Sequence, residues 1–125
     1  MINVNDLRDF LAKHDQQWQT VAELASGIGT DDERGVRNKL SSLFIQHYNT
    51  GDFAWQPTHS EPAVVMRPGD PVTYHYAPSM TAADYASVVN ACLAQALAAP
   101  LKSEARGWWS RAEQSLRAMR AYLEG

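Results

Sequence analysis

Two helix-start motifs stand ten residues apart in the segment from Trp18 to Phe44. In Thr20–Glu23 and in Thr30–Glu33, a threonine precedes a glutamate by three residues. This spacing is typical of a capping box, in which the hydroxyl and the carboxylate each accept a free backbone N–H at a helix start. Gly27 and Gly29 lie between the motifs and can form a tight turn. The segment therefore predicts a short helix, a turn and a longer helix, which is a helix-turn-helix.

The longer helix has one apolar and one polar face. At about 3.6 residues per turn, one side of the helix carries Val36, Leu40 and Phe44. These side chains would pack on the preceding helix, against Leu24. The other side carries polar side chains of the types that read DNA, since arginine pairs with guanine and asparagine with adenine. A solvent-exposed face on an ordinary helical hairpin would have the same pattern. The residues expected to contact base edges or phosphate are Arg34, Arg37, Asn38 and Ser41, with Lys39 contacting phosphate only.

Residues 53–78 lack helical periodicity and are rich in proline, valine and aromatic residues. Phe53–Gln56 and Val72–Tyr76 predict strands, with Ala63–Met66 as a third candidate, and the prolines and glycine of Pro68–Pro71 predict a turn. Three helices followed by a β-hairpin predict a winged helix-turn-helix domain over residues 1–78. Arg67 would lie near the tip of the wing, where it could contact the DNA backbone.

The remaining chain is expected to be helical. Val4–Asp15 predicts a first helix with Asn3 as its N-cap. Thr81–Asp84 is a variant cap for a helix that Pro100 interrupts, and a final helix is predicted within Ser103–Leu123. The fold class is therefore mainly α with a small β-hairpin, with a C-terminal helical region over residues 79–125.

Apolar side chains recur along the final helix at alternating spacings of four and three, as in a coiled-coil seam. This stripe could pack on the 81–99 helix of the same chain, or it could form a homodimer interface. A membrane surface is a third alternative, which Glu113 and Glu124 beside the stripe oppose. We expect a homodimer. The interface residues are Trp109, Ala112, Leu116, Met119 and Leu123.

The net charge of −3 counts against indiscriminate nucleic-acid binding, which is largely electrostatic. The charges are unevenly distributed, because residues 1–60 hold eight acids and five bases, whereas residues 102–125 hold three acids and five bases. Asp31, Asp32 and Glu33 would repel phosphate at the start of the DNA-reading helix. Acids at that position also stabilise the helix dipole, so they have a structural reason to be there.

Several other functions lack support in the sequence. No apolar run approaches the roughly 20 residues that span a membrane, and the polar N-terminus is unlike a secretory signal. The single cysteine, Cys92, is expected to be a buried thiol in a cytoplasmic protein. The four histidines show no metal-ligand spacing, and no catalytic constellation is present. We therefore expect no enzyme activity, no metal, no cofactor and no membrane partner.

The segment Glu104–Met119 resembles the C-terminal motif of PerC-type regulators of enteric bacteria and their prophages. In that motif, an acidic-alanine-basic-glycine run precedes an aromatic residue, an arginine-alanine pair and a hydrophobic stretch. Ser115 and Leu116 depart from it, since the family tends to have arginine and tryptophan there. The resemblance implies a transcriptional regulator, often an activator, and a helix break between Gly107 and Trp108. The matching residues are Glu104, Ala105, Arg106, Gly107, Trp109, Arg111, Ala112, Leu116 and Met119.

Together these patterns predict a sequence-specific DNA-binding transcriptional regulator of a bacterium or prophage, which binds double-stranded DNA as a homodimer. The alternative is a winged-helix protein–protein interaction module that binds a phage or host factor without binding DNA. The acidic total charge favours the alternative, whereas the polar face of the longer helix favours DNA.

Overall fold

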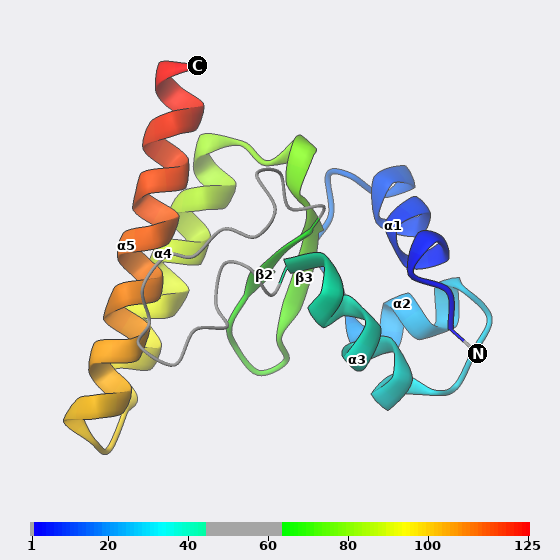
Figure 1. The fold of residues 1–125 in the computed structure, drawn as a ribbon, viewed down its shortest axis with the longest axis horizontal. Helices are drawn as coiled ribbons and strands as arrows, with labels where there is room; N and C mark the ends of the chain where they lie inside the picture. Colours follow the sequence, from blue (N-terminus) through cyan, green and yellow to red (C-terminus); the bar gives the residue numbers. More distant parts are fainter. Residues whose placement is uncertain (1, 45–63) are drawn as a thin grey trace.

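The chain is mainly helical, with a small antiparallel sheet between two groups of helices (Figure 1). The computed structural model describes residues 2–44 and 64–125, with their side chains except those of Ser41, Ser42 and Phe44. A short 3₁₀ turn, Ala77–Ser79, follows the last strand. The helices and strands are α1 (Val4–Lys13), β1 (Gln19–Thr20), α2 (Val21–Gly27), α3 (Glu33–Phe44), β2 (Val64–Arg67), β3 (Thr73–Tyr76), α4 (Ala82–Ala98) and α5 (Lys102–Glu124).

The sheet has three strands in the order β1-β3-β2, all antiparallel to their neighbours. Strands β2 and β3 form the predicted hairpin, in which Val64 pairs with Tyr76 and Arg67 with Thr73. Strand β3 begins one residue later than the sequence predicted, and β2 ends one residue later, at Arg67. The predicted first residue of β2, Ala63, lies outside the described residues. The two-residue strand β1 was not predicted. The predicted strand Phe53–Gln56 lies outside the described residues.

The two faces of the sheet close two separate cores. On one face, Val64 and Tyr74 are buried with side chains of α1, α2 and α3, including Leu7, Leu24 and Leu40. The opposite face carries Val65, which is buried with residues of α4 and α5, among them Val88, Cys92 and Ala112. Successive strand residues point to opposite faces, so the β2–β3 hairpin contributes to both cores at once. Figure 1 shows this layering, with α1–α3 on one side of the sheet and α4–α5 on the other.

Local side-chain caps fix most of the helix starts as the sequence predicts. The Asn3 side chain accepts the N–H of Asn5 at 2.8 Å and begins α1. Both Thr20 with Glu23 and Thr81 with Asp84 form complete capping boxes, at the starts of α2 and α4. Each box satisfies amides that have no partner within the helix, which explains why these short polar motifs are reliable signals.

The second predicted capping box, Thr30 with Glu33, is wrong in register. The Thr30 hydroxyl instead accepts the N–H of Asp32 at 3.1 Å, and the Asp32 carboxylate accepts the N–H of Gly35 at 3.0 Å. Asp32 is thus the cap of α3, and aspartate serves this role as well as threonine does. The preceding turn forms as predicted, since Gly29 has a φ of 80°, a conformation that costs glycine little.

Helix α5 runs without a break from Lys102 to Glu124, so the expected division between Gly107 and Trp108 is wrong. Gly107 is buried inside the helix. Helices α4 and α5 form an antiparallel hairpin. Ala112 of α5 is buried against residues of α4. Within residues 2–44 and 64–125, none of the helices is both long enough and apolar enough to cross a membrane.

Candidate nucleic-acid interface

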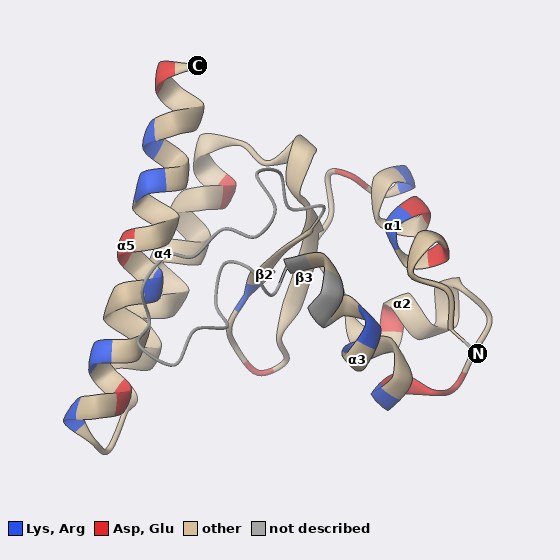
Figure 2. Cartoon of the chain, in the orientation of Figure 1, with Lys and Arg blue, Asp and Glu red and all other residues tan. Residues whose placement is uncertain are grey.

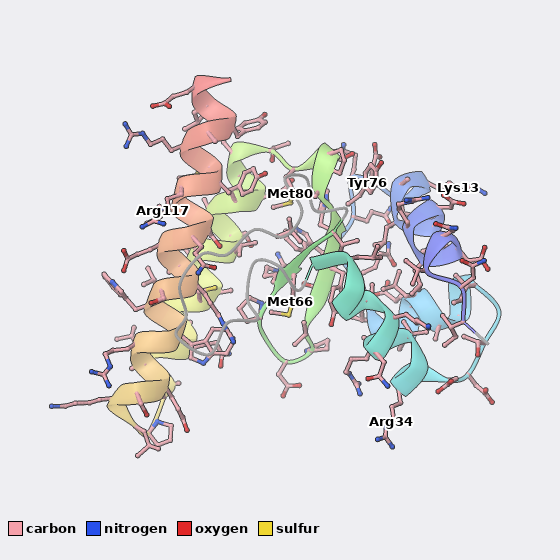
Figure 3. All side chains as sticks on the ribbon, in the orientation of Figure 1. Lys13, Arg34, Met66, Tyr76, Met80 and Arg117 are labelled. Carbon is pink, nitrogen blue, oxygen red and sulfur yellow. The ribbon has the colours of Figure 1, made fainter. Side chains whose placement is uncertain are left out.

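Helix α3 separates buried apolar side chains from exposed polar ones. Val36 and Leu40 have no solvent exposure. The side chains expected to contact DNA lie on the opposite surface, and Figure 3 shows Arg34 extending away from the body of the molecule. Ser41 belongs to α3, but its side chain lies outside the described part of the structure. The exposed residues of this polar face are Arg34, Arg37, Asn38 and Lys39.

A groove of about 730 Å³ runs beside this polar face. Its walls come from α3, from the start of α2 and from the β2–β3 hairpin, so all three parts of the N-terminal region shape it. The lining residues are Glu33, Arg37 and Asn38 of α3, Thr20, Val21 and Ala22 at the start of α2, and Met66, Gly69, Asp70, Pro71, Val72 and Tyr74 of the hairpin.

Arg37 carries the positive charge of the groove, and Glu33 and Asp70 carry the negative charges among its described lining residues. Burial raises the pKa of Tyr74 above its ordinary value, and the nearby positive charge of Arg37 acts in the opposite direction. The Tyr74 phenol therefore stays neutral at physiological pH. Arg37 and Tyr74 line the same groove, between α3 and the hairpin.

Acidic residues surround the beginning of α3. Figure 2 shows negative charge in the turn before α3, next to the positive charges of the helix itself. Asp31, Asp32 and Glu33 are all exposed there. Because the Asp32 carboxylate caps the helix, one of these acids has a structural role. The remaining acids oppose phosphate at this end of α3, beside Arg34, more than they do along Arg37 and Asn38.

Arg67 lies on the other face of the sheet from this groove. Its guanidinium donates from Nε to the Thr73 hydroxyl at 3.1 Å and from Nη1 to the Ser87 hydroxyl of α4 at 2.9 Å. The same group stacks over the Trp18 ring, 4.3 Å from its centroid. Strand alternation explains the placement, since Val64 and Met66 face the α1–α3 core and their neighbour Arg67 faces α4. These contacts argue against the backbone contact expected of Arg67, and we leave it out of the candidate interface.

The expected dimer stripe on α5 divides into two parts. Ala112 is buried and Met119 is half-buried, on the side of α5 that faces α4. In contrast, Trp109, Leu116 and Leu123 remain exposed. The α4–α5 hairpin thus covers part of the stripe within one chain and leaves a line of large apolar side chains uncovered.

The contribution of the hairpin and of α2 to the groove was not predicted from the sequence. Alternation of Val72, Tyr74 and Tyr76 indicated which strand residues face the core. Val72 and Tyr74 line the groove with Arg37, next to the residues around Thr20 that the pairing of β1 with β3 brings beside Tyr74. That pairing joins segments more than fifty residues apart, and no local signal in the sequence predicts it.

Comparison with known proteins adds no relative: no family model matches the chain, and no curated protein and no solved structure matches it. The chemistry of the described residues therefore carries the functional proposal.

Proposed function

We propose that this chain is a winged helix-turn-helix protein that binds double-stranded DNA sequence-specifically and regulates transcription in a bacterium or prophage. The observation that carries the proposal is the separation of buried apolar side chains from exposed polar side chains on α3. The apolar side chains Val36 and Leu40 are fully buried, whereas Arg34, Arg37, Asn38 and Lys39 are exposed. An exposed helix with arginine and asparagine can read guanine and adenine in the major groove.

The arrangement of α2, α3 and the β2–β3 hairpin supports this assignment. In the proposed complex, α3 enters the major groove, with α2 before it and the hairpin as the wing. Arg34, Arg37, Asn38 and Ser41 contact base edges or phosphate, and Lys39 contacts phosphate. The groove between α3 and the hairpin then lies beside the sugar–phosphate backbone of one strand, where Arg37 supplies the positive charge.

The proposed regulator acts in the cytoplasm as a homodimer. Each subunit offers few cations to the phosphate backbone, and linking two sites raises the overall affinity without any new contact. The exposed side chains Trp109, Leu116 and Leu123 are the proposed dimer surface. The similarity of Glu104–Met119 to PerC-type regulators is in keeping with a role in transcription. The proposal assigns no catalytic residue, metal or cofactor.

A second function is favoured by the acidic residues around the groove. Glu33 and Asp70 line it together with Arg37, and the chain as a whole carries a net charge of −3. Such a groove suits a protein segment of mixed charge better than it suits a phosphate chain. In this alternative, the same winged helix binds a phage or host protein and does not bind DNA. Fold alone does not decide between the two functions.

A gel-shift titration of the full chain against DNA fragments from upstream of its own gene tests the proposal. We expect one fragment to bind far more tightly than the others, with an affinity that falls as salt rises because phosphate contacts release counterions. Equal binding to all fragments would reduce the proposal to non-specific attraction. No salt-dependent binding to any fragment would overturn it and favour the protein-binding alternative.

A further inference from the structure

The exposed large apolar side chains of the described residues all lie in the C-terminal hairpin. They are Leu97, Leu101, Trp109, Leu116, Tyr122 and Leu123. Three of them, Trp109, Leu116 and Leu123, are exposed by 56%, 44% and 65% and follow one another on α5 at intervals of seven residues. Seven residues are about two helical turns, so the three side chains form one line along the outer surface of the helix.

This line is symmetric about Leu116, because Trp109 precedes it and Leu123 follows it by the same number of residues. We propose that α5 of a second copy of this chain packs antiparallel on the line, with the two-fold axis passing beside Leu116. Trp109 then packs on the partner's Leu123, and Leu116 packs on the partner's Leu116. Such a self-complementary contact is what two-fold symmetry requires.

The residues beside the line suit close packing of two helices. On the side towards α4, the half-buried Ala105 borders the line, and its small side chain allows the partner helix to approach. The other flank is charged and exposed, with Glu113 and Arg120 at successive positions of the seven-residue repeat. Figure 2 shows both basic and acidic residues along the length of α5.

The charges select the antiparallel direction. With the axis beside Leu116, the charged flanks of the two helices face each other, and Glu113 of each subunit lies next to the partner's Arg120. In a parallel pair, the charged flank would face the α4 side of the partner helix, where the corresponding α5 positions hold the uncharged Trp108, Ser115 and Tyr122. Arg120 also forms an ion pair with Glu124 within α5, at 3.0 Å. Both side chains are exposed, so this pair contributes little stability and leaves Arg120 able to contact a second carboxylate.

This inference rests on the homodimer in the proposed function and adds its direction and register. It does not rest on DNA binding. Both α4 helices would lie on the same side of the paired α5 helices, which makes a four-helix arrangement of two hairpins.

Disulfide cross-linking in the full chain, without DNA, tests the register. We expect Leu116→Cys to form a covalent dimer under mild oxidation, and Trp109→Cys and Leu123→Cys to form none when each is alone. A mixture of these two variants should cross-link, because residue 109 meets the partner's residue 123. In this register, equivalent 109 positions lie about 21 Å apart, well beyond the roughly 7 Å between Cα atoms that a disulfide can bridge. The wild-type chain, whose Cys92 is buried, is the control.

Cross-linking of Trp109→Cys with itself would overturn the antiparallel direction. Absence of any Leu116→Cys dimer, with a 13.9 kDa monomer by analytical ultracentrifugation at high concentration, would overturn the dimer itself. These results are independent of DNA, so a chain that cross-links as expected and ignores DNA contradicts only the proposed function.

A charge exchange tests the flank. Glu113→Arg alone and Arg120→Glu alone should each weaken dimerisation roughly 2- to 30-fold, because each removes two symmetric ion pairs. The double variant E113R/R120E restores both pairs between subunits, although the Arg120–Glu124 pair within the helix stays lost. We expect sedimentation equilibrium to show recovery in the double variant, and additive weakening would contradict the pairing. Leu116→Glu, at the centre of the line, should give a folded monomer.

Discussion

Val64 and Val65 are neighbours on β2, yet their side chains are buried in different cores. Val64 lies among α1, α2 and α3, and Val65 lies among α4 and α5. Trp18 and His75 reinforce this junction, since their rings contact edge to face at 4.9 Å and the His75 Nε2 lies 3.6 Å from the Asp84 carboxylate of α4. The hairpin that we propose as a wing is therefore also the connection between the N-terminal helices and the C-terminal hairpin.

The core beneath α3 is the first target for mutation. Leu40→Ala should lower the free energy of unfolding by about 2–5 kcal/mol, because Leu40 is fully buried beside Leu24 and its truncation leaves a cavity. Urea denaturation measures the change. Arg34→Ala, on the exposed face of the same helix, should stay within about 0.5 kcal/mol of the wild type. Equal effects of the two substitutions would mean that the faces of α3 are misassigned.

Arg67 should contribute to the stability of the fold and not to DNA binding. Arg67→Ala removes hydrogen bonds to Thr73 and Ser87 and the stacking on Trp18, so we expect a loss of about 1–3 kcal/mol in the free energy of unfolding. Arg67→Lys keeps the charge but has no planar group to make these contacts together, so it should recover little of the loss. Thermal or urea denaturation tests both variants.

The same variants separate the two roles of Arg67. If Arg67 contacted the DNA backbone, Arg67→Lys would largely preserve binding and Arg67→Ala would reduce its salt dependence. We expect no change in salt dependence for either variant at a temperature where both are folded. A reduced salt slope for Arg67→Ala would return this residue to the interface.

The Cys92 thiol should make stability depend on pH in the alkaline range. Burial raises the pKa of Cys92 from 9.0 to about 11, against the opposing effect of the Arg111 charge. Between these values the unfolded chain releases a proton that the folded chain retains. The stabilisation is therefore complete below pH 9 and is lost as the pH rises towards 11.

Urea denaturation at about pH 8 and about pH 10 measures this effect. The free energy of unfolding should fall between the two, and it should fall less in Cys92→Ala. Tyr85, whose pKa burial also raises, contributes in the same direction in both proteins, so the difference between them isolates the thiol. Parallel pH dependences would show that Cys92 ionises as easily in the folded chain as in the unfolded one.

Local signals account for the features that the sequence predicted well. Asn3, Thr20 and Thr81 cap their helices because a side chain and an amide two or three residues away are enough to make a cap. Thr30 failed because Asp32, two residues later, offered a competing cap. The burial of Leu24 and Leu40 followed from helical spacing and is confirmed, and the Phe44 side chain lies outside the described residues.

Features that depend on distant pairing were not predictable in the same way. Strand β1 has only two residues and exists because Gln19 and Thr20 pair with β3. The face of the sheet on which Arg67 lies depends on which residues of β2 face the N-terminal helices. Val64 and Val65 are both apolar, so the alternation of apolar and polar residues did not predict that choice. Likewise, the α5 stripe predicted an apolar surface but not its division between α4 and the exposed line.

The central claim is that the polar face of α3 reads DNA, and binding measurements on variants of that face test it most directly. Against the fragment that the wild type prefers, Arg37→Ala and Asn38→Ala should each lose about 1–3 kcal/mol of binding free energy, with folding unchanged. Arg8→Ala removes an exposed arginine from α1 and is the control for the positive charge lost in Arg37→Ala. We predict that fluorescence anisotropy titrations will show specific losses for the two α3 variants only. Equal affinities for Arg37→Ala, Asn38→Ala and Arg8→Ala would contradict the account.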